Sequence, residues 1–282
     1  MRAPGRREFL RNGLLAAGGL AGLAAYACEI EPHWIEFSRR SMPVAGLPPA
    51  LAGARILHLS DLHVGPRVSE TYQLGVLRRA AALNADFVVF TGDLVTWRGA
   101  QPLERLGRVV PHLPRGRLGT FLIPGNHDYG PGWSHPEIAR EVLAFAERAG
   151  ASILRNERVT VAGLTFVGMD DLWSGQLDIA RALSGLPAGT PAIALCHNPD
   201  ACDLPGWEPF RGWILAGHTH GGQVRPPFLP PPLLPVRNHR YAAGEVDLGA
   251  GRRLYVSRGI GHLLQVRFNV RPEVTVFTLA PA

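Results

Sequence analysis

The sequence predicts an α/β fold, and three observations indicate it. Five short apolar runs recur along the chain, and each ends in Asp, His or Asn. Segments with the period of an amphipathic helix separate several of these runs. With 282 residues and 46% hydrophobic side chains, the chain has enough apolar surface for a large core. Short strands that alternate with helices are typical of α/β domains.

The N-terminal segment, residues 1–27, is expected to direct the protein to a membrane. All basic residues of the chain are arginines, and this segment carries +3 of the total net charge of +6. Its uncharged run at 13–27 is shorter than the ~20 residues of a spanning helix and suits the apolar region of a signal peptide. The string RREFL at Arg6–Leu10 resembles a twin-arginine export signal. An uncleaved anchor with cytoplasmic arginines is the alternative.

The end of this segment leaves the processing of the chain open. Ala25–Ala27 has the small-x-small pattern of a cleavage site, and Cys28 directly after it would be acylated in a lipoprotein. Each alternative places the rest of the chain in the cell envelope, either exported or anchored at the membrane. The other cysteines, Cys196 and Cys202, are expected to be buried thiols rather than a disulfide.

Residues 28–53 are rich in proline and are expected to connect the N-terminal segment to one domain at 54–282. The five apolar runs predict strands within 55–63, 86–94, 119–128, 191–200 and 212–222. Helical patterns cover 69–83, 102–112 and 134–151, and in the last of these Ser134 and Glu137 have the spacing of a capping box. The runs LTFVGMDD (164–171), RLYVSRG (253–259) and EVTVFTLA (273–280) suggest a second, more antiparallel sheet.

Polar residues follow each of the five strands, at the sheet edge where functional residues gather in open α/β folds. A single histidine after a strand is usually structural, but the same chemistry at five strand ends predicts one shared site. The residues at these ends are Asp61, His63, Asp93, Asn126, His127, Asp128, His197, His218 and His220. The remaining histidines lack this context and are treated as structural, with His239 and His262 left open.

The order and spacing of these blocks resemble the calcineurin-like metallophosphoesterase family. The blocks are D-x-H at Asp61–His63, G-D at Gly92–Asp93, G-N-H-D at Gly125–Asp128, His197, and G-H-T-H at Gly217–His220. The resemblance covers 54–282 and implies a four-layer α/β/β/α sandwich of two mixed sheets with a two-metal centre. The flanking residues resemble a bacterial exported or membrane-associated subgroup. That subgroup includes manganese cell-wall phosphoesterases and UDP-diacylglucosamine hydrolases.

The resemblance also implies a role for each residue of the site. Two divalent cations would be bound, most simply manganese, with iron or zinc as alternatives. A hydroxide between them would attack phosphorus, His127 would protonate the leaving oxygen, and Asp128 would either orient His127 or cap a turn. The motif glycines would leave room for phosphate to approach the backbone. The implied ligands are Asp61, His63 and His220 for the first metal, Asp93 as the bridge, and Asn126, His197 and His218 for the second.

The implied activity is hydrolysis of a phosphodiester, phosphomonoester or pyrophosphate in an envelope lipid or cell-wall component. One alternative is a UDP-2,3-diacylglucosamine pyrophosphatase of lipid A synthesis on the cytoplasmic face, and another is a non-catalytic metal-binding interaction protein. No nucleic-acid partner is expected, because the chain beyond the N-terminal segment carries a net charge of only +3. The sequence does not define the substrate, the native metal or the oligomeric state.

The proline- and leucine-rich loop at 223–240 follows the last metal motif, and it is either a lid or a rigid surface segment. As a lid, it would meet lipid chains through Phe228, Leu229, Leu233 and Leu234. The expected partners are a phosphorylated lipid or other envelope substrate and a membrane surface. The residues that would bind a second phosphate or a sugar acid are Arg237, His239, Arg240 and Arg258.

Overall fold

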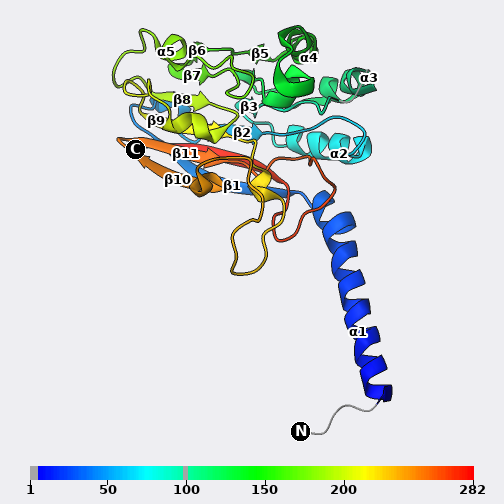
Figure 1. Ribbon diagram of the computed structural model, residues 1–282. Helices are drawn as coiled ribbons and strands as arrows, with labels where there is room; N and C mark the ends of the chain where they lie inside the picture. Colours follow the sequence, from blue (N-terminus) through cyan, green and yellow to red (C-terminus); the bar gives the residue numbers. More distant parts are fainter. Residues whose placement is uncertain (1–5, 98–100) are drawn as a thin grey trace.

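Two six-stranded sheets pack face to face in the computed structural model, which describes residues 6–97 and 101–282 (Figure 1). The first sheet has the order β1-β12-β2-β3-β4-β5, and the second has the order β10-β11-β9-β8-β7-β6. The strands of the first sheet are β1 (Glu36–Val44), β12 (Glu273–Pro281), β2 (Arg55–Leu59), β3 (Phe87–Thr91), β4 (Gly119–Ile123) and β5 (Ser152–Ile153). Those of the second are β10 (Gly244–Gly249), β11 (Arg252–Val256), β9 (Gly212–Ala216), β8 (Ala192–Leu195), β7 (Leu164–Gly168) and β6 (Glu157–Val161).

Both sheets are mixed. In the first sheet only the pairing of β12 with β2 is antiparallel. In the second sheet the two outer pairings are antiparallel and the three inner ones are parallel. The predicted α/β class and the second, more antiparallel sheet are therefore confirmed.

Helices cover the outer face of each sheet and complete four layers. The α-helices of the body are α2 (Glu70–Ala81), α3 (Gln101–Val109), α4 (Pro136–Arg148) and α5 (Ile179–Leu183). Short 3-10 turns are η2 (Glu31–His33), η3 (Pro49–Leu51), η4 (Val110–His112), η5 (Asn126–Tyr129), η6 (Pro131–Trp133), η7 (Pro199–Asp203), η8 (His220–Gly222) and η9 (His239–Tyr241). One core cluster lies under α2 to α4, a second under α5, and a third between the two sheets.

The core between the sheets explains why the strand runs are so apolar. Every residue of β3 and β7 is buried, because each strand is covered on both faces. The rings of Phe87 and Phe121 in the first sheet contact Phe166 in the second, with centroids 5.0 and 4.5 Å apart. These aromatic contacts fix the sheets against each other and so hold their carboxyl-end loops together.

Two sequence expectations need correction. The run EVTVFTLA forms β12 in the first sheet, where it pairs with β1 and β2, and not in the second. α4 begins at Pro136 with His135 as its N-cap residue, and no Ser134 capping box forms. Instead, His135 Nδ1 lies 2.9 Å from the Glu137 carboxylate, so Glu137 is engaged by its neighbour.

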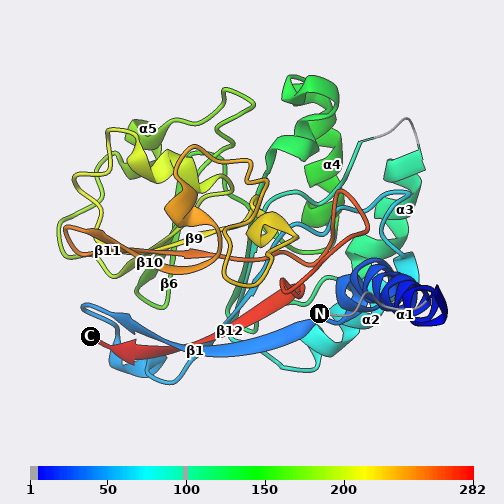
Figure 2. The ribbon, with the colours of Figure 1, turned by 60° about the horizontal axis from the view of Figure 1, so that its bottom comes forward.

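The proline-rich stretch at 28–53 is bound into the body. Its strand β1 pairs in parallel with β12 from Glu36↔Glu273 to Val44↔Pro281, and Figure 2 shows the two strands side by side. Glu31 is fully buried and accepts hydrogen bonds from the backbone N–H of Val270, at 2.6 Å. The chain between α1 and β2 therefore contributes to the fold as well as connecting its parts.

An apolar helix, α1 (Arg6–Ala25), projects from the body and continues through a π-helical turn, η1 (Tyr26–Ile30) (Figure 1). The helical segment Arg6–His33 is 28 residues long and apolar enough to cross a membrane, and its apolar part makes no buried contact with the body. A signal sequence and an anchor share these properties. Cys196 and Cys202 are free buried thiols, as expected.

Candidate metal centre

Seven side chains meet where five strands end. β2, β3 and β4 of the first sheet and β8 and β9 of the second lead into the loops that carry them. Each side chain belongs to a residue that is at most 5% exposed, so bulk water is largely excluded from their mutual contacts. The seven residues are those implied by the sequence motifs: Asp61, His63, Asp93, Asn126, His197, His218 and His220.

Five of these residues adopt a backbone conformation that side chains rarely tolerate. The φ angles are +55° at Asp61, +50° at His63, +58° at Asp93, +72° at His218 and +51° at His220. Such a conformation costs about 1–3 kcal/mol per non-glycine residue and persists only where the surroundings enforce it. Their concentration in three loops indicates that the loops are shaped for a common function.

The glycines beside the ligands are required by the close approach of these loops. A Cβ at Gly217 would collide with the side chain of Ser60 and the carboxylate of Asp61. A Cβ at Gly125 would collide with Asp93. The sequence interpretation was that the motif glycines leave room for phosphate. The structure shows that Gly217 and Gly125 make room for neighbouring ligand side chains.

The side chains form two groups that could each hold a metal ion. In the first group, Nε2 of His63 lies 2.9 Å from Nε2 of His220, which is 3.3 Å from Oδ1 of Asp61. In the second group, Asp93, His197 and His218 have ligand atoms within 4.8 Å of one another.

Asp93 lies between the two groups. Its Oδ2 is 3.2 Å from Nε2 of His197 in the second group and 3.6 Å from Nε2 of His63 in the first. Asn126 joins the second group, with Oδ1 3.1 Å from Nε2 of His197. This arrangement matches that expected of a bridging carboxylate between two cations.

Hydrogen bonds at the outer nitrogens of two histidines turn their inner nitrogens toward the centre. Nδ1 of His197 lies 2.7 Å from the Thr91 carbonyl oxygen, and Nε2 of His218 lies 2.9 Å from the Pro235 carbonyl oxygen. A carbonyl oxygen only accepts, so these nitrogens carry the ring protons. The opposite nitrogens face the centre, and they are the atoms that would coordinate a metal after losing any proton they carry. The donor set therefore fits two divalent cations.

His63 and His220 are supported differently. Nδ1 of His63 lies 2.8 Å from Oγ1 of Thr96. Nδ1 of His220 lies 3.4 Å from Nη2 of Arg267, a fully buried arginine that also donates to the carbonyl oxygens of Arg258 (2.9 Å) and Gly261 (2.7 Å). Burial lowers the pKa of Arg267 to about 10. Arg267 lies far from the motifs in sequence, which is why the sequence interpretation missed it.

The charges of the centre favour cations. Burial alone would raise the pKa of Asp61, but His220 and His197 outweigh it and hold that pKa below its ordinary value. Burial opposes protonation of His197, yet the Asp93 carboxylate raises the pKa of His197 to about 10. Burial lowers the pKa of His218 to about 3. The carboxylates of Asp61 and Asp93 therefore remain ionised at neutral pH and attract positive charge into the loops.

His127, the expected general acid, lies beside the centre without belonging to either ligand group. Its backbone N–H donates to Oδ1 of Asp93 at 2.9 Å and so helps to orient the bridge. Its ring contacts the ring of His63 edge to face, with centroids 5.1 Å apart. Burial lowers the pKa of His127.

Asp128 serves the backbone. Its carboxylate accepts hydrogen bonds from the N–H groups of Gly125 (2.9 Å), Asp93 (3.0 Å) and Val95 (3.2 Å). Within the described residues, no hydrogen bond joins it to the His127 ring. The structure therefore shows the turn cap expected of Asp128, and its role as partner of His127 stays a prediction.

Two tryptophans, which the sequence interpretation missed, form a platform beside the centre. The rings of Trp133 and Trp173 stack with centroids 4.7 Å apart. Trp173 contacts His218 edge to face at 4.4 Å, and Trp133 contacts His127 at 6.2 Å. Trp173 is 38% exposed, and Trp133 has a φ of +58°, which is rare for a bulky residue. The only sequence signal was an aromatic residue in a Pro-Gly turn shortly after the G-N-H-D block.

The four residues expected to contact substrate do not form one cluster of free cations. Arg258 is engaged by ion pairs to Glu273 (3.1 Å) and Glu36 (3.2 Å), which join β11 to β12 and β1. His262, whose role the sequence left open, is structural, because its Nε2 lies 3.1 Å from a backbone oxygen. The other three expected residues, Arg237, His239 and Arg240, are exposed at the end of the 223–240 loop.

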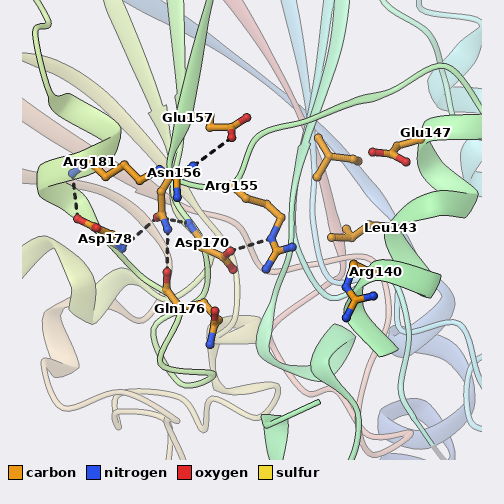
Figure 3. Close-up of a pocket in the computed structure, with 11 residues that line it drawn as sticks. Arg140, Leu143, Glu147, Arg155, Asn156, Glu157, Asp170, Gln176, Asp178 and Arg181 are labelled. Carbon is orange, nitrogen blue, oxygen red and sulfur yellow. Dashed lines mark hydrogen bonds and ion pairs between the residues drawn. The ribbon is translucent and has the colours of Figure 1, made fainter. Parts of the chain in front are cut away.

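A separate polar cavity of about 490 Å³ opens between α4 and the edge of the second sheet (Figure 3). Arg155 pairs with Asp170 at 2.8 Å in its wall and donates to the Tyr129 hydroxyl at 2.9 Å. None of the seven ligand candidates lines this cavity. The cavity is linked to the metal centre through Tyr129, because this residue bonds to Arg155 and directly follows the G-N-H-D block.

Comparisons with known proteins agree with this geometry. A family model described as Calcineurin-like phosphoesterase matches residues 54–222, which include all seven ligand candidates. The chain is 33% identical to phosphodiesterase YaeI of Escherichia coli (strain K12), over 97% of this chain and 98% of that protein. It is 32% identical to the uncharacterized metallophosphoesterase YkuE of Bacillus subtilis (strain 168), over 99% of each. It is 25% identical to UDP-2,3-diacylglucosamine pyrophosphatase LpxG of Chlamydia muridarum (strain MoPn / Nigg), over 89% and 91%.

Proposed function

The chain belongs to the calcineurin-like phosphoesterase family and is a metal-dependent phosphoric ester hydrolase, and from this premise we propose that its substrate is an envelope lipid or cell-wall component. The bond cleaved is a phosphodiester, phosphomonoester or pyrophosphate. The observation that carries the proposal is the pair of buried His/Asp groups that meet at Asp93 in a protein with an exposed apolar helix, α1.

Two divalent cations would be held by the seven ligand candidates, with Asp93 between them and Asn126 in the second group. Manganese is the proposed metal, with iron and zinc as alternatives, because imidazole and carboxylate ligands suit these ions better than calcium. When bound, such cations activate water and neutralise charge on the phosphoryl oxygens. The identity of the metal is a proposal that metal analysis of the purified protein tests.

The protein's own groups then position the reaction. The His127 backbone N–H and the Asp128 carboxylate together fix the loop around Asp93. The His127 ring lies next to His63, where a protonated imidazole can give its proton to the leaving oxygen. Trp133 and Trp173 offer a flat apolar surface at the same side, on which part of the substrate can rest.

Two placements in the cell follow from α1. The arginines at its start, at Arg6, Arg7 and Arg11, support an exported or anchored enzyme whose body lies in the envelope, with a twin-arginine-like route as the proposed path. The similarity to LpxG supports a second candidate, a UDP-2,3-diacylglucosamine pyrophosphatase on the cytoplasmic face.

Phosphorus NMR of the full chain in detergent tests the proposal and separates the candidates. The protein is loaded in turn with manganese, iron and zinc and mixed with UDP-diacylglucosamine, anionic phospholipids, wall polymer and a generic aryl phosphodiester. Asp93→Asn is the blank. Selective cleavage of a phospholipid or wall polymer supports the envelope substrate, and selective cleavage of UDP-diacylglucosamine supports the cytoplasmic one. If only the aryl ester is cleaved, the hydrolase remains but the proposed substrate class is rejected.

A further inference from the structure

The loop 225–235, called the apolar loop below, exposes three large hydrophobic side chains. Phe228 is fully exposed, Leu233 is 77% exposed and Leu229 is 60% exposed. Six prolines stiffen the loop, so these side chains are held outward and cannot readily fold back. An exposed apolar cluster of this kind marks an interaction surface or a membrane contact.

The base of this loop is connected through Phe268 to the residues directly after α1, Tyr26 and Ala27, which are called the foot of α1 below. Val224 forms a parallel bridge with Phe268, and the backbone of Phe268 bonds to Gln223 and Arg225, each at 2.9 Å. The Phe268 ring contacts Tyr26 at 6.5 Å, and the N–H of its neighbour Arg267 donates to the Ala27 carbonyl oxygen at 2.8 Å. Figure 1 shows α1 and the gold loop leaving the body on the same side.

Amphipathic residues surround the point where α1 meets the body. Trp34 is 51% exposed, and the Arg271 guanidinium lies 4.2 Å from the centre of its ring. Ile30 and Leu264 are also more than half exposed. Tryptophan and arginine are typical of the level where a membrane protein passes from lipid to water. A bilayer is the partner that would contact α1, these residues beside its end and the apolar loop together.

We propose that the apolar loop is a second membrane contact, which inserts Phe228, Leu229 and Leu233 into the bilayer beside α1 and seats the metal centre at the lipid headgroups. The loop packs directly on the metal-binding turn: the Pro235 carbonyl oxygen holds His218, and the Leu233 carbonyl oxygen lies 3.0 Å from where a Cβ of Gly222 would be. Insertion of the loop therefore positions the centre where the phosphoryl group of a lipid lies. This consequence for the substrate rests on the proposed function, whereas the membrane contact itself does not.

Depth-dependent quenching in proteoliposomes tests the contact with the full chain. Phe228→Trp adds a fluorophore at the loop tip, and Leu118→Trp, directly before β4 and opposite the strand ends, is the matched control for another exposed residue. With acyl-chain-brominated phospholipids, we expect the emission added at 228 to shift to the blue and to be quenched relative to unbrominated vesicles. The emission added at 118 should do neither. Equal, unquenched emission at both positions would reject the proposal.

Activity gives a second test with a different failure. Replacement of Phe228 and Leu229 by serine keeps Leu233 and the prolines that pack on the metal-binding turn. It should leave hydrolysis of a water-soluble aryl phosphodiester unchanged and slow hydrolysis of a phospholipid in vesicles ~10-fold or more, because the loop then buries less apolar surface in the bilayer. Equal loss on both substrates would mean that the loop only supports the centre and would overturn the substrate consequence. If the wild-type protein cleaves neither lipid nor wall polymer, the proposed function fails, while the quenching result still decides the membrane contact.

Discussion

His197 and His218 present one nitrogen each to the metal centre because a backbone carbonyl oxygen holds the other. The Thr91 carbonyl oxygen lies at the end of β3 and the Pro235 carbonyl oxygen lies in the 223–240 loop, and both are acceptors only. The fold therefore sets the orientation of both rings before any cation arrives, which lowers the cost of assembling the site. Thr96 gives similar support to His63 through a hydroxyl.

The support of His63 by Thr96 predicts a defect in metal affinity. Thr96→Val keeps the side-chain shape but removes the hydroxyl 2.8 Å from Nδ1 of His63. We expect the affinity for a cation to fall about 10-fold, as is typical when such a supporting hydrogen bond is lost. Thr160→Val is the matched control, because it removes a Thr160–Thr165 hydrogen bond of the same length on β6. Calorimetric titration of manganese into the metal-free proteins measures both, and equal affinities would refute the role of Thr96.

The bridge and the expected acid should separate in their effects on metal and turnover. Asp93→Asn should lower metal content and activity together, because Asp93 contacts both ligand groups. His127→Ala keeps the backbone N–H that binds Asp93, so metal content should be retained while turnover falls ~10²-fold or more for esters with poor leaving groups. Metal analysis and steady-state kinetics measure the two quantities. Equal metal loss in both variants would show that the acid assignment of His127 is wrong.

The strand-end pattern predicted one shared site, because polar residues after strands of one sheet edge meet, and the family resemblance implied which seven of these residues are metal ligands. It could not predict Arg267, Trp133 or Trp173, since their contacts depend on how long loops fold back on the centre. Asp128 illustrates the same limit. Its position in the motif left two roles open, and only the path of the backbone near Gly125 shows that it caps the turn.

At the scale of elements, β12 shows why pairing was harder to predict than strand formation. The alternating run at 273–280 correctly predicts a strand, but nothing local determines which sheet receives it. Buried Glu273 at its start bonds Ser38 of β1 at 2.7 Å and Tyr255 of β11 at 2.7 Å, and it pairs with Arg258. One carboxylate therefore joins strands of both sheets, a long-range contact that the sequence pattern does not contain.

This junction predicts a stability that depends on acid pH. Burial would raise the pKa of Glu273, but the hydrogen bonds and charge of Arg258, with help from Ser38 and Tyr255, lower it to about 2, from 4.5 in the unfolded chain. A lowered folded-state pKa contributes stability above pH 4.5 that is lost as the pH falls toward 2. Glu273→Gln should therefore cost about 3 kcal/mol at pH 7, from a linkage of about 1.4 kcal/mol per pKa unit.

Urea unfolding of the full chain in detergent at several pH values measures this effect. The difference between wild type and Glu273→Gln should shrink between pH 4.5 and 2, the window set by the two pKa values. Glu141→Gln, on the exposed side of α4, is the control and should change stability by less than about 0.5 kcal/mol at any pH. Parallel pH curves for wild type and Glu273→Gln would remove Glu273 from the account of stability.

At the scale of the whole molecule, the two-sheet α/β architecture followed from the family resemblance, and the strand ends located its site. The role of 28–53 in the fold could not be predicted, because a proline-rich stretch is typical of a connecting segment. Only the structure shows that its strand β1 pairs with β12. The contact between the apolar loop and the foot of α1 was also out of reach, since it joins residues about 240 positions apart through Phe268. Such contacts depend on the assembled fold and not on local pattern.

The division of ligands between the sheets predicts that the metals hold the molecule together. Asp61 and His63 of the first group follow β2 in the first sheet, while His220 follows β9 in the second. The second group is divided in the same way, with Asp93 after β3 and its histidines after β8 and β9. Separation of the sheets therefore breaks both groups, and cations that bind only the folded state add to the free energy of unfolding.

Chelation should consequently lower the melting temperature of the full chain in detergent. A cation at 1,000 times its dissociation constant contributes about 4 kcal/mol per site, and a domain of this size loses roughly 2–4 °C per kcal/mol, so removal of both should cost roughly 15–30 °C. Scanning calorimetry before and after EDTA measures this loss, and manganese should restore it. Asp93→Asn, which contacts both groups, should melt low from the start and respond little to EDTA. A wild-type melting temperature that EDTA leaves unchanged would mean that the two sheets hold together without the metals, through the aromatic core between them.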